Sequence, residues 1–259
     1  MGDDGIERDG IKAGDCVVVT GGGGGFGRAF SRRLAKGGAK IAVWEFNADS
    51  GRETVRQVEA EGGQARFFQV DLGQRREIEA AVDKTIAAYG VPYCVINNAS
   101  VYPRASLVDM TAEDWERTLT VNLTAPFLTL KAFGPHMFKR KRGVVINICS
   151  GRALQGTPTG ANYACTKAAL LSLTKTVALE WAKHGIRVNA IVPGVSFTAM
   201  PLENTTPEEL VERGKKNNPL GRVGYPDDVA GLAAFLVSAD AAYMTGQGIA
   251  INGGQVMIP

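Results

Sequence analysis

Short apolar runs alternate with longer amphipathic runs along most of this chain. The apolar runs are nearly continuous in hydrophobicity and rich in Val and Ile, which is typical of strands buried on both faces of a parallel sheet. They predict strands at residues 16–20, 41–45, 67–70, 93–97, 144–149, 187–192 and 248–251. The amphipathic runs predict helices at 26–36, 49–61, 74–89, 163–183 and 226–237, and one long helix or two in succession between 113 and 138.

This alternation predicts the α/β fold class. Because crossovers between parallel strands are right-handed, it favours a doubly wound (Rossmann) parallel sheet of about seven strands, with helices on both faces. No Pro/Ser-rich linker or shift in composition divides the chain, so residues 1–259 are expected to form a single domain.

Composition and charge exclude several classes of partner. The chain has 259 residues, 45% of them hydrophobic, and a net charge of +3, which is ordinary for a globular protein. The densest basic cluster, residues 139–142, is interpreted as a solvated helix end, so no nucleic-acid partner is expected. No apolar run is long enough to span a bilayer, and the acidic N-terminus lacks the apolar core of a signal peptide, so we expect no membrane association.

The cysteines and histidines indicate neither disulfides nor a metal site. The four cysteines, Cys16, Cys94, Cys149 and Cys165, contain no Cys-x-x-Cys pair, which is typical of buried thiols in a reducing compartment. The two histidines are too few and too far apart for a zinc site. We therefore expect a cytoplasmic protein without a bound metal.

The most informative polar pattern combines Ser150, Tyr163 and Lys167. Of the six tyrosines, only Tyr163 is followed four residues later by Lys, and positions i and i+4 share one face of a helix. An ammonium near a phenol favours the phenolate, so Lys167 is expected to lower the pKa of Tyr163 toward neutrality. Such a phenol can exchange a proton with an alcohol or carbonyl oxygen, to which Ser150 can donate a hydrogen bond. A half-buried Tyr beside a surface Lys is the alternative.

A glycine-rich run separates the first predicted strand from the first predicted helix. It comprises Thr20, the five glycines at 21–25, Phe26 and Gly27. Glycines there permit a tight turn and a close approach to a pyrophosphate, while the helix offers free N–H groups and the positive end of its dipole. This position indicates a dinucleotide site, although a glycine pattern alone would also fit a flexible loop.

Glu45 ends the second predicted strand, 18 residues after Gly27. A carboxylate at that point can accept hydrogen bonds from both ribose hydroxyls of an adenosine and would repel a 2′-phosphate. No Lys or Arg lies within the glycine run to offset it, although Arg28 follows directly. We therefore expect NAD rather than NADP as cofactor. An ordinary charge at a strand end is the alternative.

Taken in order, the motifs resemble the short-chain dehydrogenase/reductase family over nearly the whole chain. The resemblance rests on Thr20-Gly-x-x-x-Gly25-x-Gly27, Asp71, Asn97-Asn98-Ala99, Asn122, Ser150, Tyr163-x-x-x-Lys167, and Pro193-Gly194 followed by Thr198. Each piece alone is a weak signal, whereas the ordered set is highly specific.

The resemblance implies a role for each matching residue. Tyr163 would be the general acid/base, Lys167 would also bind the nicotinamide ribose, Ser150 would hold the substrate oxygen, and Asn122 would anchor a water for proton relay. Asp71 and Leu72 would contact the adenine, Asn98 the adenosine ribose, and residues 193–198 the nicotinamide carboxamide. The implied cofactor-binding set is Gly21, Gly25, Phe26, Gly27, Glu45, Asp71, Leu72, Asn98, Tyr163, Lys167, Pro193, Gly194, Val195 and Thr198.

Other interpretations of these residues stay open. Asn122 could bond its own helix backbone, Asp71 could cap a helix, and residues 193–194 could form a plain turn. The sequence also departs from the family pattern, with Ser100 in place of the usual Gly and Cys149 where Ser or Thr is frequent. A third departure is Asn252 in place of the more usual Asp.

The substrate is expected outside the carboxyl ends of the strands, where ligands bind in doubly wound folds. Candidate contacts there are Arg104, Ser150, Arg152, Gln155 and Tyr163. Because a guanidinium matches carboxylate, sulfonate and phosphate groups, the two arginines suggest an anionic hydroxy compound or sugar derivative. Arginines that face solvent or pair with nearby acids are the alternative.

The polar stretch 196–218 follows the segment assigned to the nicotinamide. We predict that it is a mobile lid that covers the substrate. A rigid pair of surface helices is the alternative.

The leading functional prediction is an NAD-dependent oxidoreductase that oxidises a secondary alcohol, polyol or sugar hydroxyl to the carbonyl. One alternative is an NADPH-dependent carbonyl or 3-oxoacyl thioester reductase. Glu45 argues against it, because its carboxylate would repel the 2′-phosphate of NADPH. Another alternative is an NAD-sensing regulatory protein. The presence of all four implied catalytic residues argues against it, because a sensor does not need an activated phenol. The resemblance further implies a homotetramer formed through the helices within 111–138 and 161–183.

Overall fold

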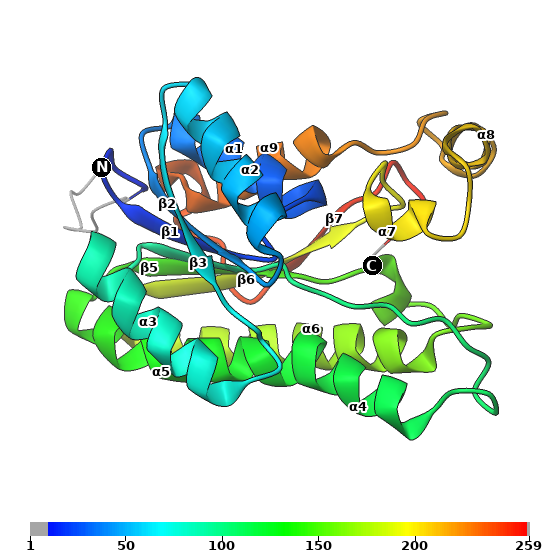
Figure 1. The fold of residues 1–259 in the computed structure, drawn as a ribbon, viewed down its shortest axis with the longest axis horizontal. Helices are drawn as coiled ribbons and strands as arrows, with labels where there is room; N and C mark the ends of the chain where they lie inside the picture. The colour runs from blue at the N-terminus through cyan, green and yellow to red at the C-terminus, as the bar shows by residue number, and fades with distance from the viewer. Residues whose placement is uncertain (1–9, 258–259) are drawn as a thin grey trace, which may run out of the picture.

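The computed structural model describes residues 10–257, which form one parallel sheet between two layers of helices (Figure 1). The strands are β1 (Cys16–Thr20), β2 (Lys40–Glu45), β3 (Gln64–Gln69), β4 (Cys94–Asn97), β5 (Gly143–Ile148), β6 (Ile186–Pro193) and β7 (Gly248–Ile251). They lie in the order β3-β2-β1-β4-β5-β6-β7, and all neighbouring strands are parallel. The prediction of a doubly wound sheet is confirmed.

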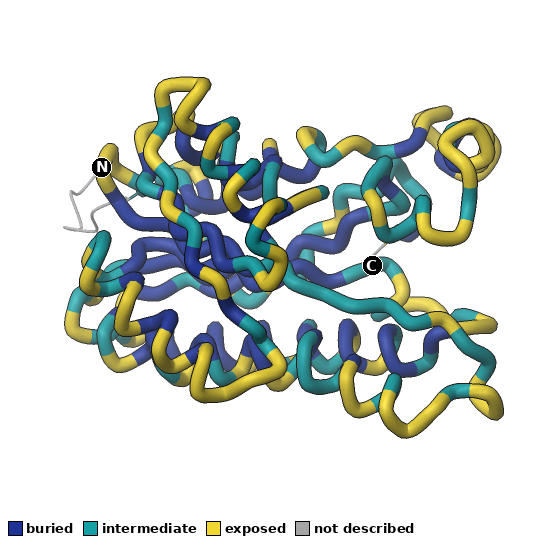
Figure 2. The backbone as a smooth tube through the Cα atoms, in the orientation of Figure 1, coloured by how far each residue is buried: buried dark blue, intermediate teal, exposed yellow. Residues whose placement is uncertain are grey.

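Helices cover both faces of this sheet. One face carries α1 (Gly25–Lys36), α2 (Ala48–Ala60) and α9 (Pro226–Val237), and the other carries α3 (Arg75–Tyr89), α4 (Ala112–Leu119), α5 (Ala125–Arg140) and α6 (Ala161–Trp181) (Figure 1). Alternate residues of β1 supply the two cores, since Val17 and Val19 pack with α1 and α9 whereas Cys16 and Val18 pack with α3 and α5. Burial on both faces explains why the central strands are apolar throughout (Figure 2).

The edge strand β3 departs most from its predicted limits. It begins at Gln64, three residues before the prediction, and its first positions alternate between exposed and half-buried. Because Gln64 and Arg66 are exposed at this edge of the sheet, the start of the strand lacks the continuous apolar pattern of the central strands.

The helical region predicted between 113 and 138 consists of two helices in succession. A π-helical turn, Thr120–Thr124 (η1), joins α4 to α5. Such turns insert one extra residue into a helix and are frequent at functional sites. Asn122 lies in this turn with its side chain fully buried.

The stretch 196–218 forms two helices beyond the carboxyl end of the sheet (Figure 1). These are α7 (Ala199–Leu202) and α8 (Pro207–Asn217). Leu210 is fully buried, and any side chain at position 214 would overlap the backbone of Val223, so α8 is anchored on one side. The secondary structure agrees with the alternative of a helix pair, while movement of the stretch stays a prediction. Short 3₁₀ turns complete the helical elements at Gly151–Ala153, Ala182–His184 and Ala239–Ala241.

The basic cluster at 139–142 is only partly the solvated helix end that was predicted. Arg140 ends α5, and its guanidinium lies 2.5 Å from the Asp15 carboxylate. Arg142 pairs with the same carboxylate at 2.9 Å, and the Asp15 side chain is only 7% exposed. These ion pairs connect the residue before β1 to the residue before β5. Two of the four basic side chains therefore have a structural role.

Replacing Asp15 with Ala should destabilise the fold, because it leaves two guanidinium groups without their shared counter-charge. We expect the free energy of unfolding to fall by about 2–3 kcal/mol, measured by urea denaturation. The exposed pair Arg75–Glu79 provides a control, since Glu79→Gln should change the value by less than about 0.5 kcal/mol. Equal effects of the two substitutions would contradict a structural role for the Asp15 pairs.

All four cysteines are free thiols. Cys16, Cys94 and Cys149 are buried as expected, but Cys165 is exposed, because it lies on a face of α6 that points away from the core. Within residues 10–257, no group of three His, Cys, Asp or Glu side chains could hold a metal ion. Over the same range, none of the helices has both the length and the apolar character of a membrane span.

Candidate active site

A cavity of about 870 Å³ lies at the carboxyl ends of the strands. Its lining comes from the segments that follow β1 to β7 and from the helices α4, α6, α7 and α8. Every sequence-predicted catalytic, cofactor and substrate residue lines it, except Gly27 and Asn122. Gly27 lies beneath the glycine loop, and Asn122 lies behind Val101, to which it is hydrogen-bonded. The structure thus brings the predicted residues to one site.

The glycine loop is shaped for close approach of an anion. Gly21 has a φ of +60°, and a Cβ there would lie 2.8 Å from the Cα of Ala99, so both conformation and space require glycine. A side chain on Gly27 would overlap the carbonyl of Gly21. The N-cap of α1, Gly24, makes no side-chain cap, and the first turn has no acidic residue. The first N–H groups of α1 therefore remain available to a phosphate.

Glu45 is fixed at the rim of this loop. One carboxylate oxygen accepts a 3.0 Å hydrogen bond from Gly23 N, and the other accepts from the N–H groups of the two residues that follow Glu45. Arg28 instead donates to the Gly23 carbonyl and, at 3.0 Å, to the Thr54 hydroxyl. The Arg28 side chain is thus bound to α2 and to the loop itself, while the Glu45 carboxylate lies where an adenosine ribose would be expected.

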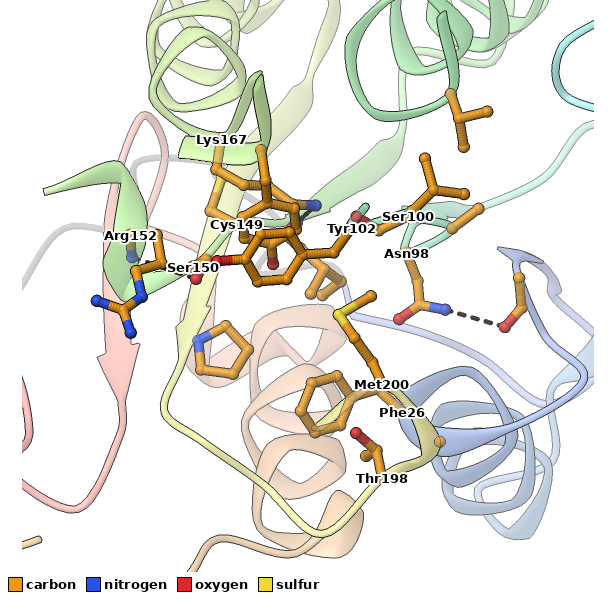
Figure 3. A pocket seen from close by; sticks show the side chains of 18 of the residues that line it. Phe26, Asn98, Ser100, Tyr102, Cys149, Ser150, Arg152, Lys167, Thr198 and Met200 are labelled. Carbon is orange, nitrogen blue, oxygen red and sulfur yellow. Dashed lines mark hydrogen bonds between the residues drawn. The ribbon is translucent and has the colours of Figure 1, made fainter. Parts of the chain in front are cut away.

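Asn98 and Asp71 each bind backbone next to the cavity. Asn98 Nδ2 donates to the carbonyls of Thr20 and Gly21 at 2.9 and 3.0 Å, which fixes the glycine loop against the end of β4 (Figure 3). Asp71 accepts a 2.8 Å hydrogen bond from Gly73 N. The alternative of Asp71 as a helix cap is wrong, because α3 begins at Arg75 and its N-cap is Gln74.

Tyr163 and Lys167 lie on the same face of α6, as their spacing predicts. Lys167 Nζ is 5.4 Å from the centre of the Tyr163 ring and donates a 2.8 Å hydrogen bond to the Ile148 carbonyl. Both side chains are buried, at 8% and 2% exposure. The ammonium is therefore held under the carboxyl end of β5, next to the phenol.

The predicted lowering of the Tyr163 pKa is wrong for this structure. Burial raises the pKa of Tyr163 to about 12, and it outweighs the hydrogen bond with Ser150, which lowers it. Burial also lowers the pKa of Lys167 to about 8. The sequence spacing indicated proximity, but it could not indicate how completely the surrounding loops exclude water from both groups.

Ser150 and Asn122 are held by backbone on either side of this pair. Ser150 follows β5, and its hydroxyl accepts a 3.2 Å hydrogen bond from Arg152 N. Asn122 binds both the N–H and the C=O of Val101, each at 2.9 Å, and donates to the Thr166 hydroxyl at 3.3 Å. The alternative in which Asn122 bonds its own helix is therefore wrong. Its side chain fixes the loop after β4 instead.

The segment after β6 closes the opposite side of the cavity. Gly194 N donates to Ile251 O at 3.1 Å, and Val195 N donates to the Gln255 side chain at 3.2 Å. A Cβ on Gly194 would lie 2.8 Å from Cα of Asn252, so this glycine is required by the turn after β7. Thr198 and Met200 lie beside Phe26, across the pocket from Ser150 and Lys167 (Figure 3).

Tyr102 is a residue of the site to which the sequence assigned no role. Its ring stacks on Tyr163 at a centroid distance of 4.1 Å, and the Arg104 guanidinium lies 4.8 Å above it. The ring thus covers the phenol of Tyr163 and contributes to its burial. The available signal in the sequence was an aromatic residue four positions after Asn98, which directly follows β4. The stacking itself depends on the path of the loop, which the sequence does not reveal.

These residues fit a nicotinamide dinucleotide. The free N–H groups at α1 suit its pyrophosphate, Glu45 suits a ribose diol, and Tyr163 and Lys167 lie where the other half of the molecule would reach. Such a cofactor supplies the hydride acceptor or donor that the side chains lack. The chain itself offers a buried proton donor or acceptor and a neighbouring hydroxyl.

Comparison with known proteins agrees with this arrangement. The family model described as Enoyl-(Acyl carrier protein) reductase matches residues 22–255. The chain is 37% identical to 3beta-hydroxysteroid dehydrogenase 1 of Eggerthella lenta, over 95% of each chain. The solved structure of a short-chain type dehydrogenase/reductase from Mycobacterium marinum matches with a TM-score of 0.87 and 30% identity, over 94% of this chain and 96% of that one.

A second solved structure is that of a blue fluorescent protein from a metagenomic library, in complex with NADPH. It matches with a TM-score of 0.85 and 34% identity, over 95% of this chain and 99% of that one. The fold, the residues around the cavity and these similarities agree. The chain belongs to the short-chain dehydrogenase/reductase family of oxidoreductases.

Proposed function

We propose that the protein is an NAD-dependent dehydrogenase that oxidises a secondary alcohol, polyol or sugar hydroxyl to the corresponding carbonyl. The observation that carries this proposal is the buried pair Tyr163–Lys167 beside Ser150, in the cavity that also contains the glycine loop. Tyr163 would accept the hydroxyl proton, Ser150 would hold the same oxygen, and the carbinol carbon would lose its hydride to NAD.

The proton has a route away from the cavity in this proposal. Lys167 would first release its own ammonium proton towards solvent, which the lowering of its pKa to about 8 favours, and the neutral amine would then take the proton from the adjacent Tyr163. Asn122 would support the route by fixing Val101 and Thr166 next to these side chains. Both residues act on protons, and neither takes part in the hydride transfer.

The preference for NAD is supported by Glu45 and Arg28. The Glu45 carboxylate is held at the loop by backbone N–H groups, and Arg28 already donates to the Gly23 carbonyl and to Thr54, so a 2′-phosphate would meet the negative charge of Glu45 while the nearby cation is engaged. We expect kcat/KM to be at least about tenfold higher with NAD than with NADP, and Glu45→Gln to reduce this preference about tenfold. The measurement is nicotinamide absorbance with each cofactor. A wild-type preference for NADP would contradict the assignment.

A reductase is the second candidate, and one feature of the site favours it. Because burial raises the pKa of Tyr163 to about 12, the phenol keeps its proton at neutral pH and could donate it to a carbonyl oxygen. The matching family model is described as an acyl carrier protein reductase, and one similar structure contains NADPH. A carbonyl or 3-oxoacyl thioester reductase using NADPH would fit these points, whereas Glu45 opposes it.

A panel of alcohols, polyols, sugars and their ketones, assayed in both directions, tests the proposed function. Oxidation of any secondary hydroxyl with NAD supports the dehydrogenase. Faster reduction of 3-oxoacyl thioesters with NADPH supports the second candidate. Tight NAD binding without turnover in either direction would instead indicate a dinucleotide sensor.

We also propose that residues 196–218 cover the bound substrate and that the protein assembles as a homotetramer in the cytoplasm. The first part is supported by Thr198, Met200 and Arg213, which line the cavity. The second is supported by Phe127 on α5 and Leu179 on α6, which are exposed apolar side chains at 46% and 85%. The free thiols are consistent with a reducing compartment.

A further inference from the structure

Charges around the cavity are separated by sign across the sheet. The two lining carboxylates, Glu45 and Asp71, follow β2 and β3. The lining arginines Arg104, Arg152 and Arg213 come after β4, β5 and β6, which are adjacent in the sheet. Among residues 10–257, no Asp or Glu lines this second half. Because the glycine loop and Glu45 belong to the first half, the positively charged half is left for the substrate.

These three arginines have exposed side chains whose hydrogen-bond donors are not used by the described part of the chain. In the described part of the chain, no side-chain hydrogen bond or ion pair involves Arg104, Arg152 or Arg213. Other arginines of the chain contrast with them, since Arg28 is bound by backbone and Thr54, and Arg222 makes a double contact with Asp228. The guanidinium groups at the substrate half therefore have donors to spare.

Arg104 is held in a defined orientation despite having no polar partner. Its guanidinium lies 4.8 Å above the Tyr102 ring, whose other face stacks on Tyr163. Stacking engages the flat face of a guanidinium and leaves the N–H groups along its edge free. Arg152 is fixed by sequence next to Ser150, and the two lie side by side at the pocket (Figure 3). Both cations are therefore close to the reacting groups.

Arg213 adds a cation from the opposite wall, on α8. The carboxylate one turn earlier on the same helix, Glu209, is bound to Thr205 and to the backbone N–H of Thr206 in a capping box. That carboxylate is engaged at the start of the helix, and although the charge of Arg213 contributes to lowering its pKa, no salt bridge joins the two side chains in the described part of the chain. Arg117 on α4 also lines the cavity and adds to the same positive potential.

We propose that the substrate carries an oxyanion, a carboxylate, sulfonate or phosphate, bound between Arg104, Arg152 and Arg213. Charge-assisted hydrogen bonds from guanidinium groups match such oxyanions in geometry and charge. An anion bound there would join α8 to the loops after β4 and β5 across the mouth of the cavity. This inference rests on the proposed dehydrogenase function and specifies its substrate class.

Matched pairs of secondary hydroxy acids and their methyl esters, such as 3-hydroxybutyrate and methyl 3-hydroxybutyrate, test the proposal. For the best pair, we expect kcat/KM of the acid to exceed that of the ester by about tenfold or more. Arg152→Gln and Arg213→Gln should each lower the value for the acid about tenfold and leave the ester within about twofold. Arg213→Lys should be less impaired with the acid than Arg213→Gln, because Lys keeps the positive charge but lacks the paired N–H donors of a guanidinium.

Arg33→Gln is the matched control, because Arg33 is exposed in the last turn of α1, at the opposite end of the sheet. It should leave the kinetics of acids and esters unchanged. A second readout, binding of each compound to the enzyme–NADH complex by NADH fluorescence, does not need turnover. Acids should bind more tightly than their esters in the wild type and lose this advantage in the two Gln variants.

The outcomes separate this inference from the proposed function. Equal kinetics and equal binding of acids and esters, equal losses for both in the arginine variants, or no binding of any acid would overturn the anion proposal while leaving alcohol oxidation intact. Absence of turnover with every acid, ester and neutral alcohol would contradict the proposed function. In that case the fluorescence titration still decides whether the arginines select an anion.

Discussion

Replacing Tyr163 with Phe should lower kcat about 10³-fold, because it removes the hydroxyl of the buried phenol that lies beside the Lys167 ammonium. The substitution keeps the ring that stacks on Tyr102, so the shape of the pocket should be preserved. We expect the affinity for NADH, measured by fluorescence, to stay within about threefold of the wild type. Nicotinamide absorbance with the best alcohol found in the substrate panel measures the loss.

Tyr225→Phe gives a suitable comparison for this variant. Tyr225 is a half-exposed tyrosine at the start of α9 and does not line the cavity. Its loss of a hydroxyl should leave kcat within about twofold, whereas activity of Tyr163→Phe within tenfold of the wild type would remove Tyr163 from the proposed mechanism.

Lys167→Met should produce an inactive protein that is more stable than the wild type. Activity should fall about 10²-fold or more, because the proton route from Tyr163 loses its acceptor. The lowered pKa of Lys167, from 10.5 to about 8, corresponds to a cost of about 3 kcal/mol for keeping the ammonium charged in the folded state. Loss of the hydrogen bond to the Ile148 carbonyl lowers the free energy of unfolding of the variant by about 1 kcal/mol. The net gain in unfolding free energy at neutral pH should be about 2 kcal/mol.

This gain should depend on pH in a defined direction. Below pH 8, Lys167 is charged in both the folded and unfolded states, so the wild type bears the full cost. Between about 8 and 10.5, the folded protein has released a proton that the unfolded chain still binds, so the wild type becomes more stable as pH rises. The advantage of Lys167→Met should therefore shrink through this window, and above it the wild type should be the more stable by about 1 kcal/mol, because only the lost hydrogen bond to Ile148 then counts.

Urea denaturation of both proteins at pH 7 and pH 10 measures this dependence. Lys175→Met is the control, because Lys175 is exposed on the same helix and its loss should not produce a pH-dependent difference. A Lys167→Met protein that is less stable than the wild type at pH 7 would show that burial of the ammonium is not costly.

The fold and most of the site could be predicted because a parallel sheet turns chain order into spatial order. Glu45, Asn98 and Ser150 each follow a strand, and the carboxyl ends of parallel strands meet at one edge. Locating the strands was therefore enough to bring these side chains together. The spacing of Tyr163 and Lys167 was sufficient for the same reason within one helix.

Features that depend on the path of a loop or on local burial could not be predicted. The stacking of Tyr102 on Tyr163 requires the conformation of the loop after β4, and no periodic pattern specifies it. The pKa of Tyr163 depends on how much water that loop excludes, and so its direction was predicted wrongly. No sequence pattern could indicate the ion pairs of Asp15, because its partners lie 125 residues and more along the chain.

The two hydrogen bonds between Asn122 and the backbone of Val101 allow substrate selectivity to change independently of proton transfer. They hold the root of the loop that carries Tyr102 and Arg104 to η1, the π-helical turn that contains Asn122. Residues beyond that fixed root can change in size and charge while the proton-transfer groups keep their positions. Selectivity can therefore diverge among descendants of this protein without a new catalytic apparatus.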